Sequence, residues 1–385
     1  MTTTTPPAAG SAHPWLVPLG LPAETEDSPA PAPAEPEPVV PAEPFVPAGA
    51  DAPAQPVAPA KTGSPVESAP EGTLEDAPVT GPGPDSGVRR RYIADILRLH
   101  SRLSFGGLAG RLHRTDSHVY RAAHGKGVIT TAAPTEAIPE RYLLGLAGFR
   151  LSEYLRAGYA SEDIVFDNSL FCEPVQGIHQ SDIHVITTDQ VTGRILGYVS
   201  LAHSEDHSPR PLDAPDRRLF PCEQAHNLRL LSLLPPSDGL TTHSVREVKR
   251  FVQAHSLTDR TLRLRVMLGL LAGISGILCQ ERHTTRMLIG DVEKHVALRH
   301  LVLLGLDVHL LDGTTPRLGL KELMHPMYVT REKVYPFLAH LPSPEETVRR
   351  SAVVQRAAAA DAPFKAVRDL LSELSGSVQH IEVAA

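Results

Sequence analysis

The chain has 385 residues, of which 42% are hydrophobic and 21% charged, and its formal net charge is −7. This charge is unevenly distributed, because residues 1–86 hold 21 of the 36 prolines and carry a net charge of −11, whereas the remainder carries +4. Once the basic segment described below is set apart, residues 127–385 carry −3, and this near-neutral balance makes no case for nucleic-acid binding by that part of the chain. The three cysteines are widely spaced, which argues against a disulfide framework and favours a reducing compartment. We therefore expect a cytoplasmic protein.

The first segment, residues 1–87, is rich in proline, alanine and glutamate and poor in large apolar side chains. Such a composition cannot offset the entropy of ordering the backbone, so it predicts a disordered leader. The most apolar window of the chain runs from Val266 to Cys279. It is too short to span a membrane and is typical of a buried core helix, so no membrane association is expected.

A basic segment follows the leader. Residues 88–126 hold nine arginines and lysines against two aspartates, a net charge of +7. The pattern predicts three short helices, of which the second is capped by Ser104, the third by Thr115 or Asp116. Gly125 is expected to end the third helix. The stretch from Val128 to Pro134 is predicted to be a linker.

The string from Leu108 to Gly125 resembles the helix-turn-helix of Cro/repressor-type regulators, which reads approximately L-A-x-x-L-x-x-S-x-S-x-I-S-R-x-x-x-G. The resemblance implies that Ser117, His118 and Arg121 contact DNA bases, while neighbouring arginines meet phosphates. The alternative is a small basic module, residues 88–127, that packs on the next domain or binds a partner protein.

The main domain is predicted at residues 136–330. A helix from Pro139 is followed by a β-hairpin, in which strands 182–188 and 194–201 are joined by a turn at Asp189–Gly193. A proline-rich loop, a strand at 244–252 and a core helix from Thr258 to Cys279 come next. A strand at 286–289, a helix at 292–304 and a strand at 307–311 complete an α+β layout, and residues 331–385 are predicted to form C-terminal helices.

This order of elements resembles that of the GCN5-related N-acyltransferases, and within them the acyl-homoserine lactone synthases and long-chain N-acyl amino acid synthases. Three features carry the resemblance over residues 140–316. They are an aspartate-containing lead before the hairpin (Asp163, Asp167), the D-x-x-T-G-x-x-x-G run from Asp189 to Gly197, and the E-x-x-R-F strand from Glu247 to Phe251. The resemblance implies transfer of an acyl group from an acyl carrier protein or acyl-CoA to a small amine.

The resemblance and the chemistry of N-acyl transfer single out several residues. The reaction needs a base for the amine and donors for the thioester oxygen. Glu247 is the expected base, and Arg250 is expected to fix that carboxylate or to bind a substrate carboxyl, the alternative being a structural ion pair between the two. A bulge at Arg246–Val248 is expected to free backbone groups near Val248 for the carrier.

The usual acetyltransferase phosphate loop, R-x-x-G-x-G/A, is absent before the core helix. Arg260, Arg263 and Arg265 are therefore expected to hold the single phosphate of a phosphopantetheine arm, together with the helix N-terminus. No permanently bound cofactor is expected, since the acyl-phosphopantetheine or acyl-CoA is a co-substrate.

Other polar residues are assigned structural or solvent-exposed places. His203, Asp206 and His207, and Cys222 with His226, are interpreted as solvated loop residues, so no metal site is predicted. His179 and His184 are expected at the surface, and Asp291 and Glu293 at the start of a helix.

Two hypotheses on function remain open. The first is an N-acyltransferase that makes an N-acyl amino acid or an acyl-homoserine lactone type of product. The second is a DNA-binding transcriptional regulator, whose acyltransferase-like domain senses an acyl ligand without catalysis. The sequence leaves the acyl length, acceptor, carrier and oligomeric state undetermined.

Overall fold

The computed structural model of the protein describes residues 84–382, except 176–177, 235–238, 294–297, 330–333 and 375. The disorder predicted for residues 1–87 falls almost entirely outside these residues. The described residues belong to one compact unit.

The described residues form ten α-helices, of which α6 is the longest. Their bounds are α1 Pro84–His100, α2 Gly106–Arg114, α3 Glu140–Ala157, α4 Glu162–Asp167, α5 Pro221–His226, α6 Arg260–Gln280, α7 Leu298–Leu303, α8 His325–Val329, α9 Pro344–Ala359 and α10 Pro363–Glu373. The strands are β1 Tyr120–His124, β2 Val128–Pro134, β3 Ile183–Asp189, β4 Ile195–Ala202, β5 Val245–Gln253, β6 Met287–Glu293, β7 Asp307–Asp312, β8 Val334–His340 and β9 Val378–Glu382.

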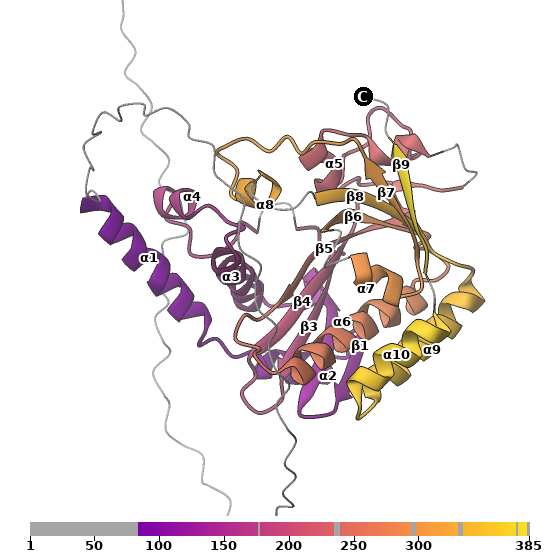
Figure 1. Ribbon diagram of the computed structural model, residues 1–385, viewed down its shortest axis with the longest axis horizontal. Coiled ribbons are helices and arrows are strands. Elements are labelled where there is room, and N and C mark those ends of the chain that lie inside the picture. The colour runs from indigo at the N-terminus through magenta and orange to yellow at the C-terminus, as the bar shows by residue number, and fades with distance from the viewer. Residues whose placement is uncertain are drawn as a thin grey trace, which may run out of the picture. The chain divides into compact units, whose positions relative to one another are not determined.

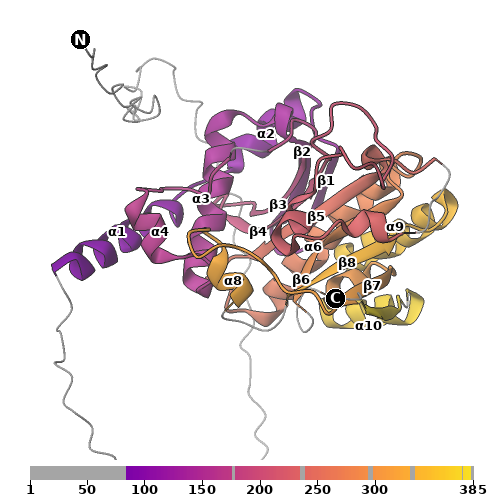
Figure 2. The same cartoon turned by 90° about the horizontal axis from the view of Figure 1, so that it is seen from above.

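All these strands form one mixed sheet in the order β1-β2-β3-β4-β5-β6-β8-β7-β9. The pairs β5–β6 and β7–β9 are parallel, and the other neighbours are antiparallel. Helices cover both faces, with α6, α7, α9 and α10 on one side and α1, α3, α4, α5 and α8 on the other (Figures 1 and 2). The sheet is therefore the middle of three layers.

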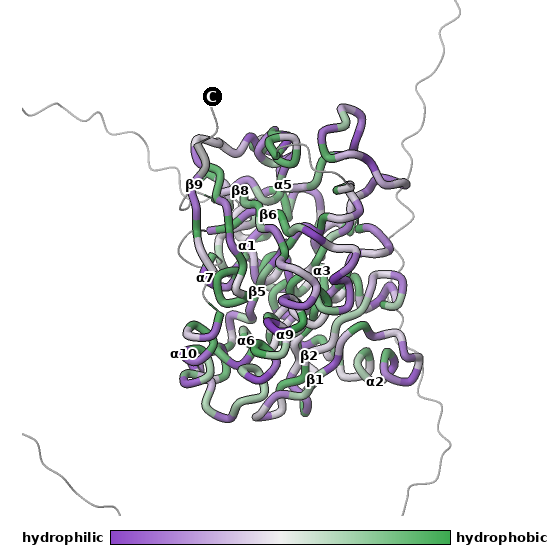
Figure 3. The backbone as a smooth tube through the Cα atoms, turned by 90° about the vertical axis from the view of Figure 1, so that its right-hand side faces the viewer, coloured by the Kyte–Doolittle hydropathy of each residue, from purple (hydrophilic) through white to green (hydrophobic). Residues whose placement is uncertain are grey.

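The core on the first side is built around α6, whose side chains pack with β3, β4, β6, α9 and α10. The apolar, green part of the chain gathers where α6 and the strands lie, with polar loops outside (Figure 3). In the described part of the chain α6 is the helix long and apolar enough to cross a membrane, yet 72% of its apolar window is buried inside the protein. Its burial agrees with the core helix predicted from the sequence.

The helix-turn-helix prediction is wrong. After α2 the chain forms β1, an edge strand, and not a third helix, and Ser117 and His118 lie in the turn between them. Arg121 is exposed on β1, and the predicted linker is the buried strand β2. No recognition helix presents the three predicted DNA contacts, so the DNA-binding prediction has no structural basis.

The β1–β2 hairpin forms because it docks closely on α6. A Cβ atom at Gly276 would lie 2.5 Å from the Tyr120 ring, and one at Gly269 would lie 2.7 Å from the Thr130 hydroxyl. These two glycines let the strands approach the helix backbone. The tertiary contact overrides the local helical pattern of the basic segment.

The second half of the chain differs from the predictions in three places. Asp291 and Glu293 belong to β6, so the interpretation that they begin a helix is wrong. The core helix α6 begins at Arg260 and not at Thr258, and it is capped by Asp259, whose carboxylate accepts from Thr261 N at 2.7 Å. The sequence also missed β8 and β9, although α9 and α10 lie where C-terminal helices were predicted.

The sheet opens into a fork between β5 and β6. The two strands pair only from Val245–Met287 to Val248–Gly290, after which β5 continues beside β4 and β6 continues beside β8. A bulge lies at this point, because Tyr198 pairs with Val252 and Ser200 with Lys249, and Arg250 has a φ of 64°. The predicted bulge is thus present but lies after Val248, not at Arg246–Val248.

The predicted hairpin is confirmed as β3 and β4, joined by a turn in which Asp189 Oδ1 accepts from Thr192 N at 2.6 Å. Hairpin, central strand, core helix and a parallel strand that diverges from the central one follow in the expected order. The predicted α+β layout is therefore confirmed, without the helix-turn-helix module.

Candidate active site

Glu247 is a buried carboxylate next to the fork. It lies on β5 one residue before Val248, the last residue of β5 that pairs with β6. The side chain is on the sheet face that α5 covers, where its Oε1 accepts from Cys222 N at 3.1 Å. Its Oε2 is buried and has no hydrogen-bond partner among the residues that the structure describes.

The surroundings of Glu247 favour its protonated form. Burial, and to a smaller extent the Asp291 carboxylate, raise the pKa of Glu247 to about 7, although Lys249 and Arg250 lower it. Roughly half of the molecules then carry the carboxylate near neutral pH. A group with such a pKa can both take up and release a proton at physiological pH.

Four side chains from three other elements surround this carboxylate. Cys222 and His226 come from α5, Asp291 from β6 and Tyr328 from α8. The Tyr328 hydroxyl donates to Asp291 Oδ2 at 2.6 Å, and His226 Nε2 lies 3.0 Å from Asp291 Oδ1. Cys222 and His226 are buried, so the interpretation that they are solvated loop residues is wrong.

Burial and the nearby carboxylates raise the pKa values of two of these groups. The pKa of the Cys222 thiol is raised well above its usual range by burial, then by Glu247 and Asp291. The pKa of Tyr328 is likewise raised, by burial and then by Asp291. Both groups therefore remain protonated at neutral pH, and Cys222 is not an activated nucleophile.

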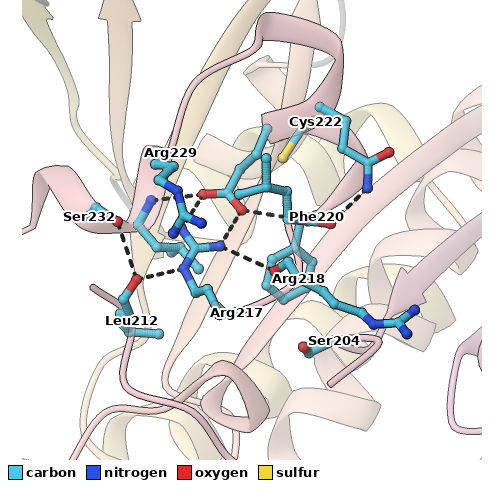
Figure 4. A network of polar contacts seen from close by, with 12 residues as sticks. Ser204, Leu212, Arg217, Arg218, Phe220, Cys222, Arg229 and Ser232 are labelled. Atoms are coloured by element: carbon cyan, nitrogen blue, oxygen red, sulfur yellow. Dashed lines mark hydrogen bonds and ion pairs between the residues drawn. The ribbon is translucent and has the colours of Figure 1, made fainter. Parts of the chain in front are cut away.

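A buried ion pair in the proline-rich loop fixes the position of α5. Arg217 donates to both carboxylate oxygens of Glu223, at 2.6 and 2.7 Å, and also to the Leu212 carbonyl (Figure 4). Glu223 in turn accepts from Phe220 N and Leu231 N. The loop that carries Cys222 and His226 is thus held from both sides by one carboxylate.

Arg250 does not pair with Glu247. Its Nε and Nη2 donate to Glu173 Oε1 at 2.7 and 2.6 Å, whereas Glu173 Oε2 accepts from Arg150 Nε at 2.6 Å. The expectations that Arg250 fixes Glu247 or forms an ion pair with it are therefore wrong, whereas its binding of a substrate carboxyl stays a prediction. Burial alone would raise the pKa of Glu173, but Arg250 and Arg150 lower it to about 2.

The arginine pair continues into a chain of hydrogen bonds on β3 and β4. Arg150 Nη1 donates to the Tyr198 hydroxyl at 3.0 Å, and this hydroxyl lies 2.7 Å from His184 Nδ1. His184 is buried, so its predicted place at the surface is wrong. Burial, and then Arg150, lower the pKa of His184 to about 3, so the ring is neutral.

The three arginines expected to bind phosphate lie in different environments. Arg260 and Arg263 are exposed in the first turn of α6, where a phosphate can reach them. Arg265 is buried and donates to the carbonyls of Ala360 and Asp361, at 3.2 and 2.9 Å. Arg265 holds the connection between α9 and α10, and its prediction as a phosphate ligand is wrong.

Within the described ranges, no group of three or more histidine, cysteine and acidic side chains is arranged to hold a metal ion. Asp206 is buried and accepts from Ser204 Oγ and Arg218 N, so it is not a solvated loop residue. The contact between α5 and Glu247 could not be found from the sequence, because 24 residues separate Cys222 from Glu247 along the chain.

Comparisons with known proteins give distant structural similarity only. No family model matches the chain, and no curated protein matches its sequence. A CoA-dependent acyl-homoserine lactone synthase, solved with SAM and isopentyl-CoA, is 14% identical, covers 66% of this chain and 93% of its own, and has a TM-score of 0.34. An N-acyl amino acid synthase from uncultured soil microbes is 14% identical, covers 59% of this chain and 97% of its own, and has a TM-score of 0.34. A ribosomal L7/L12 alpha-N-protein acetyltransferase is 10% identical, covers 58% and 93%, and has a TM-score of 0.29.

Proposed function

We propose that the chain is an N-acyltransferase, which moves an acyl group from the thioester of an acyl carrier protein or of CoA to the amine of a small acceptor. The product is of the N-acyl amino acid or acyl-homoserine lactone type. The observation that carries the proposal is Glu247, a buried carboxylate with a pKa of about 7 and an unpartnered Oε2, beside the fork between β5 and β6.

Glu247 supplies the base that the reaction needs. The neutral amine of the acceptor attacks the thioester carbonyl carbon, and Glu247 in its ionised form takes the proton that the nitrogen loses as the new C–N bond forms, directly or through a water molecule. The tetrahedral intermediate then expels the thiolate, and the proton held by Glu247 is available to it. Because Cys222 stays a thiol, we assign the transfer to direct attack and not to an acyl-enzyme on this cysteine.

The fork supplies the donor side of the site. Beyond Val248 the backbone of β5 has no partner on β6, so its polar groups on that side are available to an extended pantetheine arm. Arg260 and Arg263 stand exposed at the N-terminus of α6, which follows β5 directly. We propose that these two arginines bind the phosphate of the donor.

Arg250 acts in this scheme as a positioning residue. It occupies the bulge at the fork with a positive φ, and its guanidinium is tied to Glu173. The buried Arg150 and the half-buried Arg250 share this one carboxylate, which leaves one positive charge beside the fork to attract anionic substrate groups. The free thiols of Cys172, Cys222 and Cys279 agree with the cytoplasmic location that we propose.

The test is an acyl-transfer assay with the full chain. Acyl-CoA and acyl carrier protein thioesters of increasing length are combined with a panel of amino acids and amines, and N-acyl products are detected by mass spectrometry. We expect one donor class to give product, and Glu247→Gln to lower kcat about 10²- to 10⁴-fold.

The matched control is Glu136→Gln, which makes the same change at an exposed position and should leave kcat unaltered. Absence of product with every pair of donor and acceptor would contradict the proposal. Unchanged turnover in Glu247→Gln would remove this residue from the mechanism.

The second hypothesis, a DNA-binding regulator, depended on a predicted recognition helix. The structure has the edge strand β1 in that place, so we do not propose this function further.

A further inference from the structure

A small pocket lies on the sheet face covered by α5, and its lining includes Lys249, two residues after Glu247 on β5. Its volume is about 10 Å³. It is bounded by the start of β3, the end of β4, the loop before α5 and one residue of β5. The lining residues that matter below are Asp182, Arg218, Phe220, Pro221 and Lys249.

Lys249 is a cation without a partner in this pocket. Its ammonium makes no hydrogen bond or ion pair with any residue in the described part of the chain, and the side chain is half-buried. The neighbouring arginines each form an ion pair: Arg246 with Glu281, Arg250 with Glu173, and Arg218 with Glu205. A positive charge of this kind, held at a pocket without a counter-ion in contact, is suited to bind an anionic ligand group.

Asp182 does not neutralise Lys249 by direct contact. Its Oδ1 accepts from His203 N at 2.7 Å and its Oδ2 from His179 N at 3.3 Å, so backbone donors orient this carboxylate. Burial raises the pKa of Asp182, and the charge of Lys249 lowers it. Lys249 therefore lowers the pKa of Asp182 by its charge, across the pocket and without a direct contact.

Lys249 and Glu247 face the same side of β5. The strand is regular here, because Glu247 pairs with Ala202 and Lys249 with Ser200, and the bulge comes only afterwards. Glu247 contacts the backbone of α5, and Lys249 lines the pocket with the residues that start this helix. Residues two apart on a strand lie about 6.6 Å from each other on one face.

This spacing places an anion and a cation on either side of a small molecule. An amino acid carries its amine and its carboxylate on one carbon atom. With the amine at the carboxylate of Glu247, its own carboxylate points along the strand towards the ammonium of Lys249. An amine without a carboxylate would fill the site but leave the Lys249 ammonium without a hydrogen-bond partner, which is unfavourable.

We propose that Lys249 binds the carboxylate of the acceptor, and that it is the residue which makes the enzyme select amino acids over amines without a carboxylate. This inference rests on the acyl-transfer function proposed above. Lys249 also lowers the pKa of the base Glu247, an effect that is the same for every acceptor. Selectivity, and not absolute rate, is therefore the quantity that reports on carboxylate binding.

The test compares pairs of acceptors that differ only in the carboxylate: alanine with ethylamine, leucine with 3-methylbutylamine, and phenylalanine with phenethylamine. The measured quantity is the ratio of kcat/KM for the acid to that for the amine, with the donor thioester that supports turnover. Lys249→Met should lower this ratio about 10- to 100-fold, through KM of the acid, since a hydrogen bond to a charged group is lost. Lys249→Arg should restore most of it.

The matched control is Arg218→Met, which removes a cation from the same pocket that is already tied to Glu205. This variant should change the ratio less than about threefold, as expected for an exposed ion pair. A ratio that stays at the wild-type value in Lys249→Met, or that falls equally in Arg218→Met, would overturn the inference.

A binding experiment separates this inference from the proposed function. Millimolar concentrations of each amino acid should raise the Tm of the wild-type protein more than the paired amine does, and Lys249→Met should abolish the difference. If no acceptor is acylated but this difference is present, the proposed reaction is wrong and the carboxylate site stands. If acylation occurs but neither the ratio nor the Tm difference depends on Lys249, the reaction stands and the assignment of Lys249 is wrong.

Discussion

Glu247 and Glu173 are both buried on the same face of the sheet, yet their surroundings drive them to opposite charge states. Glu173 lies between two guanidiniums, which lower its pKa to about 2 despite its burial. Glu247 has one backbone donor and an unpartnered oxygen, and burial raises its pKa to about 7. A buried carboxylate is a permanent anion where arginines contact it, and an exchangeable proton carrier where they do not.

This difference in pKa implies separate roles for Glu247 and Arg250, although they are only three residues apart in the sequence. Arg250 belongs to the fixed network of Glu173, which anchors the bulge of β5 to α3 through Arg150. Glu247 contacts α5 on the same face of the sheet, outside this network, and its Oε2 has no hydrogen-bond partner among the described residues. The E-x-x-R spacing thus separates a base from a structural cation, and does not build an ion pair.

Removing the charge of Glu173 should have the largest effect on stability. Glu173→Gln leaves the buried Arg150 and the half-buried Arg250 without a counter-ion, which is expected to cost about 3–5 kcal/mol of unfolding free energy. The loss of unfolding free energy is measured by urea denaturation of both proteins at pH 7. Glu373→Gln, which makes the same change in an exposed pair with Arg356, should cost less than about 1 kcal/mol.

A small effect of Glu173→Gln, comparable to that of Glu373→Gln, would contradict the permanent charge assigned to Glu173. It would also show that the bulge at Arg250 needs no anchor on α3.

The same substitution at Glu247 should act in the opposite direction and only at higher pH. Wild-type Glu247 binds a proton more tightly in the folded than in the unfolded chain, because its pKa rises from about 4.5 to about 7. Stability is therefore present at low pH and is lost between about pH 4.5 and 7, by up to about 3 kcal/mol. Glu247→Gln cannot ionise, so its unfolding free energy relative to the wild type should increase by about 2–3 kcal/mol between pH 5 and pH 8.5.

Chemical denaturation of both proteins at these two pH values measures that difference. Parallel pH dependence in the wild type and in Glu247→Gln would show that Glu247 has an ordinary pKa, and the contrast with Glu173 would disappear.

The sequence revealed those parts of the fold whose signals are local. Alternation of apolar residues and the Asp189–Gly193 turn predicted the β3–β4 hairpin, and the continuous apolar run predicted α6. Glu247 was found because it stands in a recognisable strand between hairpin and core helix. These elements keep their local preferences in the folded protein.

The parts that were missed depend on tertiary contacts. The segment around Tyr120 has a helical pattern but becomes a strand, because glycines of α6 open a surface for it. Cys222 and His226 reach Glu247 only through a long loop fixed by Arg217 and Glu223. Glu173 lies far from Arg250 in the sequence, so nothing local marked it as the partner of that arginine.

The pH dependence of single-turnover acyl transfer tests the role of Glu247 most directly. With the donor thioester preloaded, the wild-type rate should rise about tenfold per pH unit below neutrality and level off with an apparent pKa of about 7, as the base loses its proton. Glu247→Gln should be slow and show no such rise. A variant that keeps the wild-type rate and profile would contradict the assignment of Glu247 as the base.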